Sequence, residues 1–169
     1  MSHWVMRLLK HRRFDERDAQ RLLGAGALQR IGARVAASEA GHSGEIRVCV
    51  EAGLPISYLR RNATPRERAV AMFGKLRVWD TEANNGVLIY LLLAEHAIEI
   101  VADRGLARRV DAAEWQRITE TMKAAFQRSE FEAGLNQAVD AVDALLREHF
   151  MLAPGEVNPN ELPDAPDLR

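Results

Sequence analysis

Hydrophobic and polar residues alternate with a period of two between residues 44 and 52. Ile46, Val48 and Val50 fall on one side of this stretch, and mostly charged residues fall on the other. A period of two is typical of a β-strand whose successive side chains point to opposite faces. We therefore predict a strand here, with one face partly exposed to solvent.

Two further strands are predicted near the middle of the chain. Residues 87–93 are apolar at every position, which is typical of a central strand covered on both faces. A short connection over 94–97 leads to a third strand at 98–102, and a connection of this length predicts a hairpin.

Helical periodicity occupies most of the remaining chain. A helix is expected over residues 15–40, with irregular turns near Gly24 and Gly26 because glycine is costly inside a helix. Thr64-Pro65-Arg66-Glu67 predicts a capping box that begins a second helix, which runs to about residue 78 and buries Val70 and Phe73. Two long helices follow the third strand, and their buried stripes are Trp115, Ile118, Met122 and Phe126 in the first, and Phe131, Leu135, Val139, Val142 and Leu146 in the second.

This order of elements predicts an α/β fold. The first strand, the capped helix and the central strand form a βαβ unit, so these two strands are parallel, and the hairpin adds an antiparallel third strand. The resulting mixed β-sheet is expected to be sandwiched between helices. We divide the chain into a basic amphipathic N-terminal segment (1–14), an α/β domain (15–150) and an extended tail rich in proline and acidic residues (151–169).

The N-terminal segment allows more than one interpretation. Trp4, Val5, Leu8 and Leu9 lie on one face of a helix that also carries several basic residues. Such a helix suits peripheral contact with a membrane surface or binding to a partner protein. The alternatives are a helix packed on its own domain and a frayed tail.

Composition excludes several classes of protein. The 169 residues carry 23 basic and 24 acidic side chains, a net charge of −1, whereas dedicated nucleic-acid binders usually have a strong basic excess. The single cysteine, Cys49, is expected in the core. No stretch reaches the ~20 apolar residues of a membrane-spanning helix, and no signal peptide is recognised, so we expect a soluble, cytoplasmic protein.

Polar residues that could form a binding site are expected at one end of the predicted sheet. The starts of the first two strands and the end of the third bring together residues 39–45, 80–86 and 103–105. Their carboxylate and amide oxygens suit a hard cation such as Ca²⁺, and an imidazole would suit a transition metal. The same residues could instead serve as helix caps, turns and solvated loop positions. The predicted metal ligands are Asp80, Glu82, Asn84, Asn85, Asp103, Glu45 and His42.

Three stretches resemble the TPM domain family over about residues 15–150. They are Asn84-Asn85-Gly86-Val87-Leu88-Ile89-Tyr90-Leu91, then Ile98 to Leu106 with Asp103-Arg104-Gly105-Leu106 at its end, and Phe126 to Leu135. The resemblance implies a mixed sheet between helices and a divalent cation, often calcium, near the Asn84-Asn85-Gly86 loop. The resemblance also implies the phosphatase activity that is ascribed to some members of the family. Other members act as auxiliary proteins.

We therefore carry two main hypotheses. The first is a non-enzymatic module that binds a divalent cation or a protein partner. The second is a metal-assisted phosphatase acting on phosphomonoesters, in which Glu45 or His42 would be the general base. No complete catalytic motif and no glycine-rich phosphate loop occurs in the sequence, so we assign no catalytic residue and expect no organic cofactor.

Overall fold

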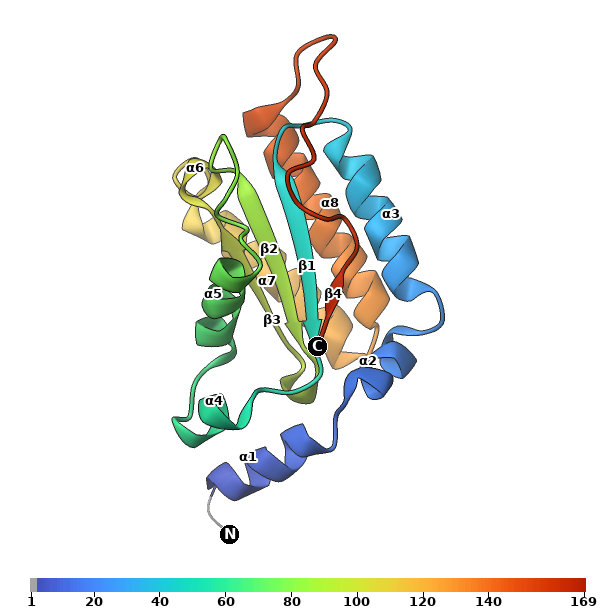
Figure 1. The fold of residues 1–169 in the computed structure, drawn as a ribbon, viewed down its shortest axis with the longest axis vertical. Helices are drawn as coiled ribbons and strands as arrows, with labels where there is room; N and C mark the ends of the chain where they lie inside the picture. Colours follow the sequence, from blue (N-terminus) through green and yellow to red (C-terminus); the bar gives the residue numbers. More distant parts are fainter. Residues whose placement is uncertain (1–2) are drawn as a thin grey trace.

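The protein is described by a computed structural model covering residues 3–169, with side chains described from residue 5 onwards (Figure 1). A mixed sheet lies between two helical layers, which confirms the predicted α/β class. The elements in chain order are α1 (His3–Arg12), α2 (Glu16–Leu23), α3 (Ala27–Glu39), β1 (Glu45–Glu51), α4 (Ile56–Arg60), α5 (Pro65–Lys75), β2 (Gly86–Leu92), the 3₁₀ turn η1 (Leu93–Glu95), β3 (Ala97–Ala102), α6 (Arg104–Ala107), α7 (Ala112–Gln127), α8 (Phe131–Phe150) and β4 (Asp167–Leu168).

The sheet has the strand order β3-β2-β1-β4. β1 pairs parallel with β2, and Glu45 lies opposite Gly86 in their register. β2 pairs antiparallel with β3, as the βαβ unit and the hairpin predict. The starts of β1 and β2 and the end of β3 therefore lie at the same end of the sheet.

Two hydrophobic clusters cover the two faces of the sheet. The larger includes Ile46, Val48 and Val50 of β1 and packs against α2, α3, α7 and α8. The smaller includes Cys49 and packs against α5 and the loops around it. Cys49 is fully buried. The sheet is thus fixed from both sides, which positions its strand ends.

Local signals set the helix boundaries. The Thr64–Glu67 capping box forms as predicted at the start of α5. The helix expected over 15–40 is instead two helices, because Gly24 and Gly26 adopt positive φ values of 91° and 71° that favour glycine. α5 also ends at Lys75, earlier than predicted. The prediction that Val70 is buried is wrong, because Val70 lies on the outer face of the helix and is 51% exposed, while Phe73 packs against the smaller cluster.

The C-terminal segment, residues 151–169, follows β1 along its length. Asn158 donates to the carbonyl oxygens of His42 and Gly44, and β4 pairs parallel with the end of β1. Arg47 donates to the carbonyl oxygens of Pro163 and Ala165. The segment expected as an extended tail therefore completes the sheet in this structure.

The expectation that one face of β1 is partly solvated is wrong. All seven residues of β1 are buried. The C-terminal segment covers Glu45 and Arg47 on this face, and Arg68 of α5 forms a bidentate ion pair with Glu51. The charged residues of β1 are thus buried with partners from distant parts of the chain.

Among residues 3–169, no helix has both the length and the apolar character needed to cross a membrane.

Candidate functional site

The three polar segments predicted to converge do meet at one end of the sheet. Glu45 begins β1 opposite Gly86, and the Asp103 amide donates to the Gly86 carbonyl oxygen over 2.8 Å. Glu45 and Asp103 therefore lie on either side of Gly86. Because adjacent strands are about 4.8 Å apart, their backbones are about 10 Å from each other.

The loop before β2 has a backbone that its sequence requires. A Cβ atom on Gly86 would lie 2.0 Å from the Val78 carbonyl oxygen, so only glycine fits there. Asn84 adopts a positive φ of 51°, and its carbonyl oxygen accepts from the Gly105 amide. The Asn-Asn-Gly sequence thus brings the loop close to the start of α6.

Three side chains at this end of the sheet each bury an oxygen atom that has no hydrogen-bond partner. These atoms are Glu45 Oε1, Asn85 Oδ1 and Asp103 Oδ2. Glu45 and Asn85 are fully buried, and Asp103 is 9% exposed. A buried polar atom without a partner costs about 1–3 kcal/mol. We call Glu45, Asn85 and Asp103 the strand-end oxygen group.

The other polar atoms of this group are engaged within the protein. Glu45 Oε2 accepts from the Leu162 amide over 3.1 Å. Asn85 Nδ2 donates to Ser43 Oγ over 3.2 Å. Asp103 Oδ1 accepts from the Arg104 amide over 2.7 Å and caps α6. Each side chain is therefore held in place by a hydrogen bond, while one of its oxygen atoms has no hydrogen-bond partner.

Three other predicted ligands lie at the surface around this group. Asp80 forms an ion pair with Arg77, and Glu82 is exposed. Asn84 is partly exposed, and its Oδ1 accepts from Arg104 Nε over 3.3 Å. The structure does not bring these three side chains into the buried group.

His42 is used in a separate buried network. Its Nδ1 lies 3.0 Å from the Gly44 carbonyl oxygen, and its Nε2 lies 3.0 Å from Ser38 Oγ. Ser38 in turn donates to Asp143 over 2.7 Å. Burial lowers the pKa of His42, and the Asp143 carboxylate opposes this effect. Both ring nitrogens therefore have protein partners, which leaves neither directed at the strand-end oxygen group.

Sequence reasoning missed another buried carboxyl group beside this site. Glu39 is 4% exposed, and its Oε1 accepts from the Ile46 amide over 2.7 Å. Burial raises its pKa to about 9, and the nearby Glu45 and Asp164 carboxylates add to this shift. Burial likewise raises the pKa of Glu45. The position of Glu39 in the converging polar segment was a signal, but the covering C-terminal segment was not predictable from it.

The donor set determines which cation would fit. Within residues 3–169, no three histidine, cysteine or acidic side chains converge as a metal cluster. The unpaired atoms of the strand-end oxygen group are two carboxylate oxygens and one amide oxygen. Such oxygens suit a hard cation of the Ca²⁺ or Mg²⁺ type and not a metal that prefers thiolate or imidazole. Glu45, Asn85 and Asp103 supply the unpaired oxygens of this type at this end of the sheet.

Comparisons with known proteins agree with this fold. The solution structure of the BA42 protein from the psychrophilic bacterium Bizionia argentinensis is similar to this chain with a TM-score of 0.73. It is 24% identical, and the match covers 85% of this chain and 93% of that one. No curated protein matches the sequence.

A family model described as the TPM domain matches residues 17–145. This range begins at α2 and includes β1–β3, both loops of the strand-end oxygen group and most of α8. It agrees with the resemblance seen in the sequence around Asn84-Asn85-Gly86. The chain belongs to the TPM domain family.

Proposed function

We propose that this TPM domain is a divalent-cation-binding module, and that the strand-end oxygen group is its binding site. The observation that carries the proposal is the set of three buried oxygens without hydrogen-bond donors on adjacent strand ends. A bound cation would satisfy atoms that the protein leaves unpaired, and so would offset their burial cost. The ligand chemistry favours Ca²⁺ or Mg²⁺.

A proton competes with the cation at this site. Burial raises the pKa of Glu45, and a carboxyl group must lose its proton before it ligates a metal. Cation affinity should therefore increase as the pH rises through the titration of Glu45. With two carboxylates, the site should bind more weakly than sites that carry three or four.

The bonds of Glu45 suggest what the cation would do. Glu45 Oε2 accepts from Leu162 of the C-terminal segment, while Asp103 caps α6. A cation shared by Glu45, Asn85 and Asp103 would link three strand ends to both of these elements. The module would then display a surface whose rigidity depends on the cation, which is compatible with a role in protein interaction.

The test uses a matched pair of helix caps. Asp103→Asn removes one proposed ligand charge but keeps an N-cap residue of equal quality. Asp111→Asn makes the same change at the exposed N-cap of α7, where Asp111 accepts from the Ala113 amide. Both variants should fold with little loss of stability, so any difference in cation binding reports on the site.

The measurement is thermal unfolding and calorimetric titration of the full chain with Ca²⁺, Mg²⁺, Mn²⁺ and Zn²⁺. At 100 times its Kd, a cation should stabilise the native protein by about 2.7 kcal/mol. For a domain of this size, each kcal/mol of stabilisation raises the Tm by roughly 2–4 °C. The increase should persist in Asp111→Asn and be lost in Asp103→Asn and Glu45→Gln. Equal responses in all four proteins would contradict the proposed site, and no response in the wild-type chain would contradict the function.

We rank the phosphatase hypothesis below binding. The proposed general bases, Glu45 and His42, are both fully buried. A phosphomonoester would have to reach one of them, and both have partners inside the protein. Hydrolysis of a simple aryl phosphate that disappears in Asp103→Asn but not in Asp111→Asn would reverse this ranking.

A further inference from the structure

Helix α1 has apolar side chains on two sides. Leu8 packs against the smaller core cluster, so one side of the helix is directed toward the domain. Met6 and Leu9 are 55% and 53% exposed. A surface helix that has packed one apolar face normally presents a polar face to solvent. The exposed apolar side of α1 therefore calls for a physical explanation.

The attachment of α1 to the domain is specific. Arg7 donates to Glu95 Oε1 and to the Ala63 carbonyl oxygen, each over 2.7 Å. His11 Nδ1 accepts from the Leu54 amide, so Nε2 carries the proton and donates to Glu95 over 2.8 Å. Burial of Glu95 opposes its ionisation, but the hydrogen bonds from His11 and Arg7 prevail and lower its pKa to about 2. These bonds fix which side of α1 faces outward.

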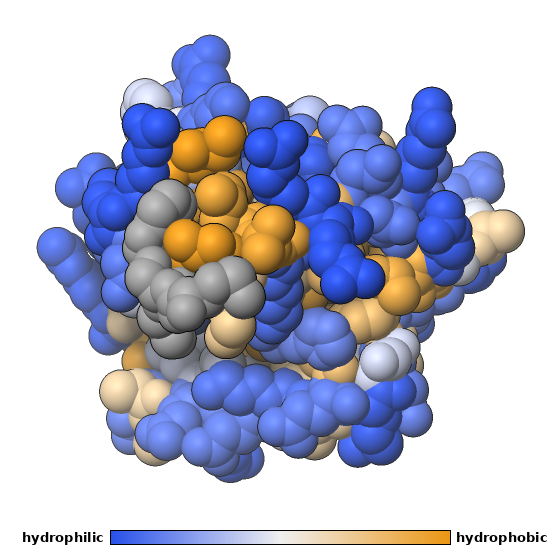
Figure 2. All heavy atoms as spheres, turned by 90° about the horizontal axis from the view of Figure 1, so that it is seen from below, coloured by the Kyte–Doolittle hydropathy of each residue, from blue (hydrophilic) through white to orange (hydrophobic). Residues whose placement is uncertain are grey.

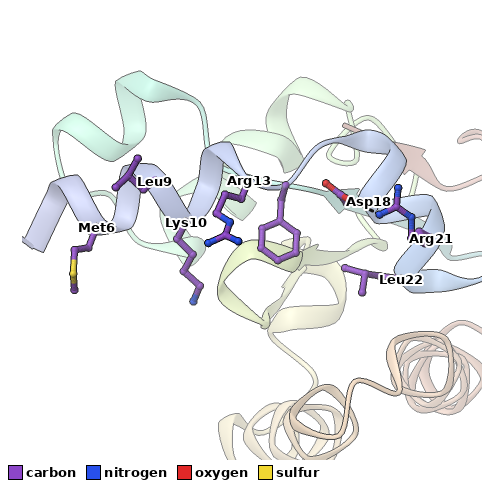
Figure 3. A pocket seen from close by; sticks show the side chains of 8 residues that line it. Met6, Leu9, Lys10, Arg13, Asp18, Arg21 and Leu22 are labelled. Atoms are coloured by element: carbon purple, nitrogen blue, oxygen red, sulfur yellow. Dashed lines mark hydrogen bonds and ion pairs between the residues drawn. The ribbon is translucent and has the colours of Figure 1, made fainter.

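A shallow hollow of about 580 Å³ lies along the outward side of α1. Met6 and Leu9 line it from α1, and Leu22, which is 41% exposed, lines it from α2. Figure 3 shows the side chains of α1 and of α2 on either side of this hollow. We call Met6, Leu9 and Leu22, with the basic residues that border them, the end surface.

Basic side chains border the apolar ones. Lys10, Arg13 and Arg21 also line the hollow. Residues 3–23 contain six lysines and arginines against three acidic residues, whereas the whole chain has a net charge of −1. Two of those acids, Asp15 and Asp18, form the capping box of α2. Seen from below the molecule, hydrophilic residues lie above and to the right of an apolar patch (Figure 2).

This combination is typical of a helix that lies in a membrane interface. Leucine and methionine enter the boundary between headgroups and acyl chains, and long basic side chains reach the anionic headgroups. A second copy of the chain fits less well, because a symmetric contact would place the same basic residues against one another. Charge complementarity therefore favours an anionic lipid surface as the occupant.

We propose that the end surface binds bilayers that contain anionic phospholipid. α1 lies at the opposite end of the long axis from α6 and the strand-end oxygen group (Figure 1). A membrane at the end surface would thus leave the proposed cation site facing away from it. The proposal is independent of cation binding.

Vesicle flotation of the full chain tests the proposal. Vesicles of phosphatidylcholine mixed with phosphatidylglycerol should bind the protein, vesicles of phosphatidylcholine alone should bind it weakly, and added salt should reduce binding to the first. Leu9→Glu should weaken binding about tenfold or more, because it removes apolar contact and adds repulsion. Lys10→Gln should weaken it less, and chiefly at low salt.

Val70→Glu is the matched control. Val70 on α5 is 51% exposed, almost the same as Leu9, so both variants place a glutamate at an exposed helical position. Val70→Glu should bind vesicles like the wild type. Equal binding by Leu9→Glu and Val70→Glu would overturn the proposal. So would self-association, or binding to an acidic amphipathic peptide, that depends on Leu9 when no vesicle binding is found.

Discussion

Glu39 lies at the end of α3, buried against the start of β1 by the C-terminal segment. Its Oε1 accepts from the Ile46 amide, and this bond ties the end of α3 to the start of β1. Burial raises its pKa to about 9 from 4.5. The native protein therefore binds one more proton than the unfolded chain between these two pH values.

This extra proton predicts a specific pH dependence of stability. Because the native state holds the proton more tightly, the free energy of unfolding should fall as the pH rises from about 4.5 to about 9. A single group contributes a slope of at most about 1.4 kcal/mol per pH unit. Glu39→Gln keeps an oxygen acceptor for Ile46 but has no proton to lose, so its slope should be flatter and its stability at pH 8 higher than that of the wild type.

Urea unfolding at several pH values between 5 and 9 measures these slopes. Glu132→Gln is the control, because Glu132 is held ionised by its hydrogen bonds to Arg30, which lower its pKa. It should keep the wild-type slope in this window. A Glu39→Gln variant whose slope matches that of the wild type would show that Glu39 is already ionised at neutral pH.

The C-terminal segment acts as an additional element of the sheet. Leu162 is 7% exposed and packs in the smaller core cluster, and its amide is the donor to Glu45. Leu162→Ala should reduce the free energy of unfolding by about 2 kcal/mol, the lower end of the range for buried leucine. Val157→Ala, in the same segment but 83% exposed, should change it by less than about 0.5 kcal/mol.

Chemical unfolding of both variants is the measurement, and equal stabilities would mean that the segment does not pack on β1 in solution. A further consequence can be followed in the same samples. The Leu162 side chain anchors the segment whose backbone amide holds Glu45, so cation binding should be weaker in Leu162→Ala than in Val157→Ala.

Elements that depend on local signals were predictable from the sequence. The Thr64–Glu67 capping box and the β2–β3 hairpin required only neighbours along the chain, and both formed as expected. The burial of the charged face of β1 could not be predicted, because the residues that cover it are Arg68 and residues 162–165, which lie far away in the sequence. Alternation in β1 indicated a strand correctly, but it could not indicate which distant residues would cover the charged positions.

The candidate site, too, could be predicted only in part from the sequence. Parallel and antiparallel pairing fixed the end of the sheet at which Glu45, Asn85 and Asp103 lie. Spacing could not distinguish these buried side chains from Asp80 and Glu82, which the loop turns outward. That difference arises from side-chain direction within a turn, where Asn85 is held by Thr81 and Ser43.

At the scale of the whole molecule, the two proposed binding sites lie toward opposite ends of the sheet (Figure 1). β1 and β2 run between them with every residue buried. Closely packed interiors of this kind do not deform continuously, and two sites are coupled only if both ligands shift the same conformational equilibrium of the protein. The sheet offers one packed arrangement, so we expect the two sites to act independently.

Independence can be tested without mixing calcium and lipid, which bind each other. Asp103→Asn, which should lose the cation response, should bind anionic vesicles with the wild-type affinity. Leu9→Glu, which should lose vesicle binding, should keep the wild-type Tm increase with the cation. In the double variant both losses should appear, each of the same size as in its single variant, since residues this far apart normally have additive effects. A change in vesicle affinity in Asp103→Asn would instead mean that the strand ends and α1 move together, and that the cation regulates membrane binding.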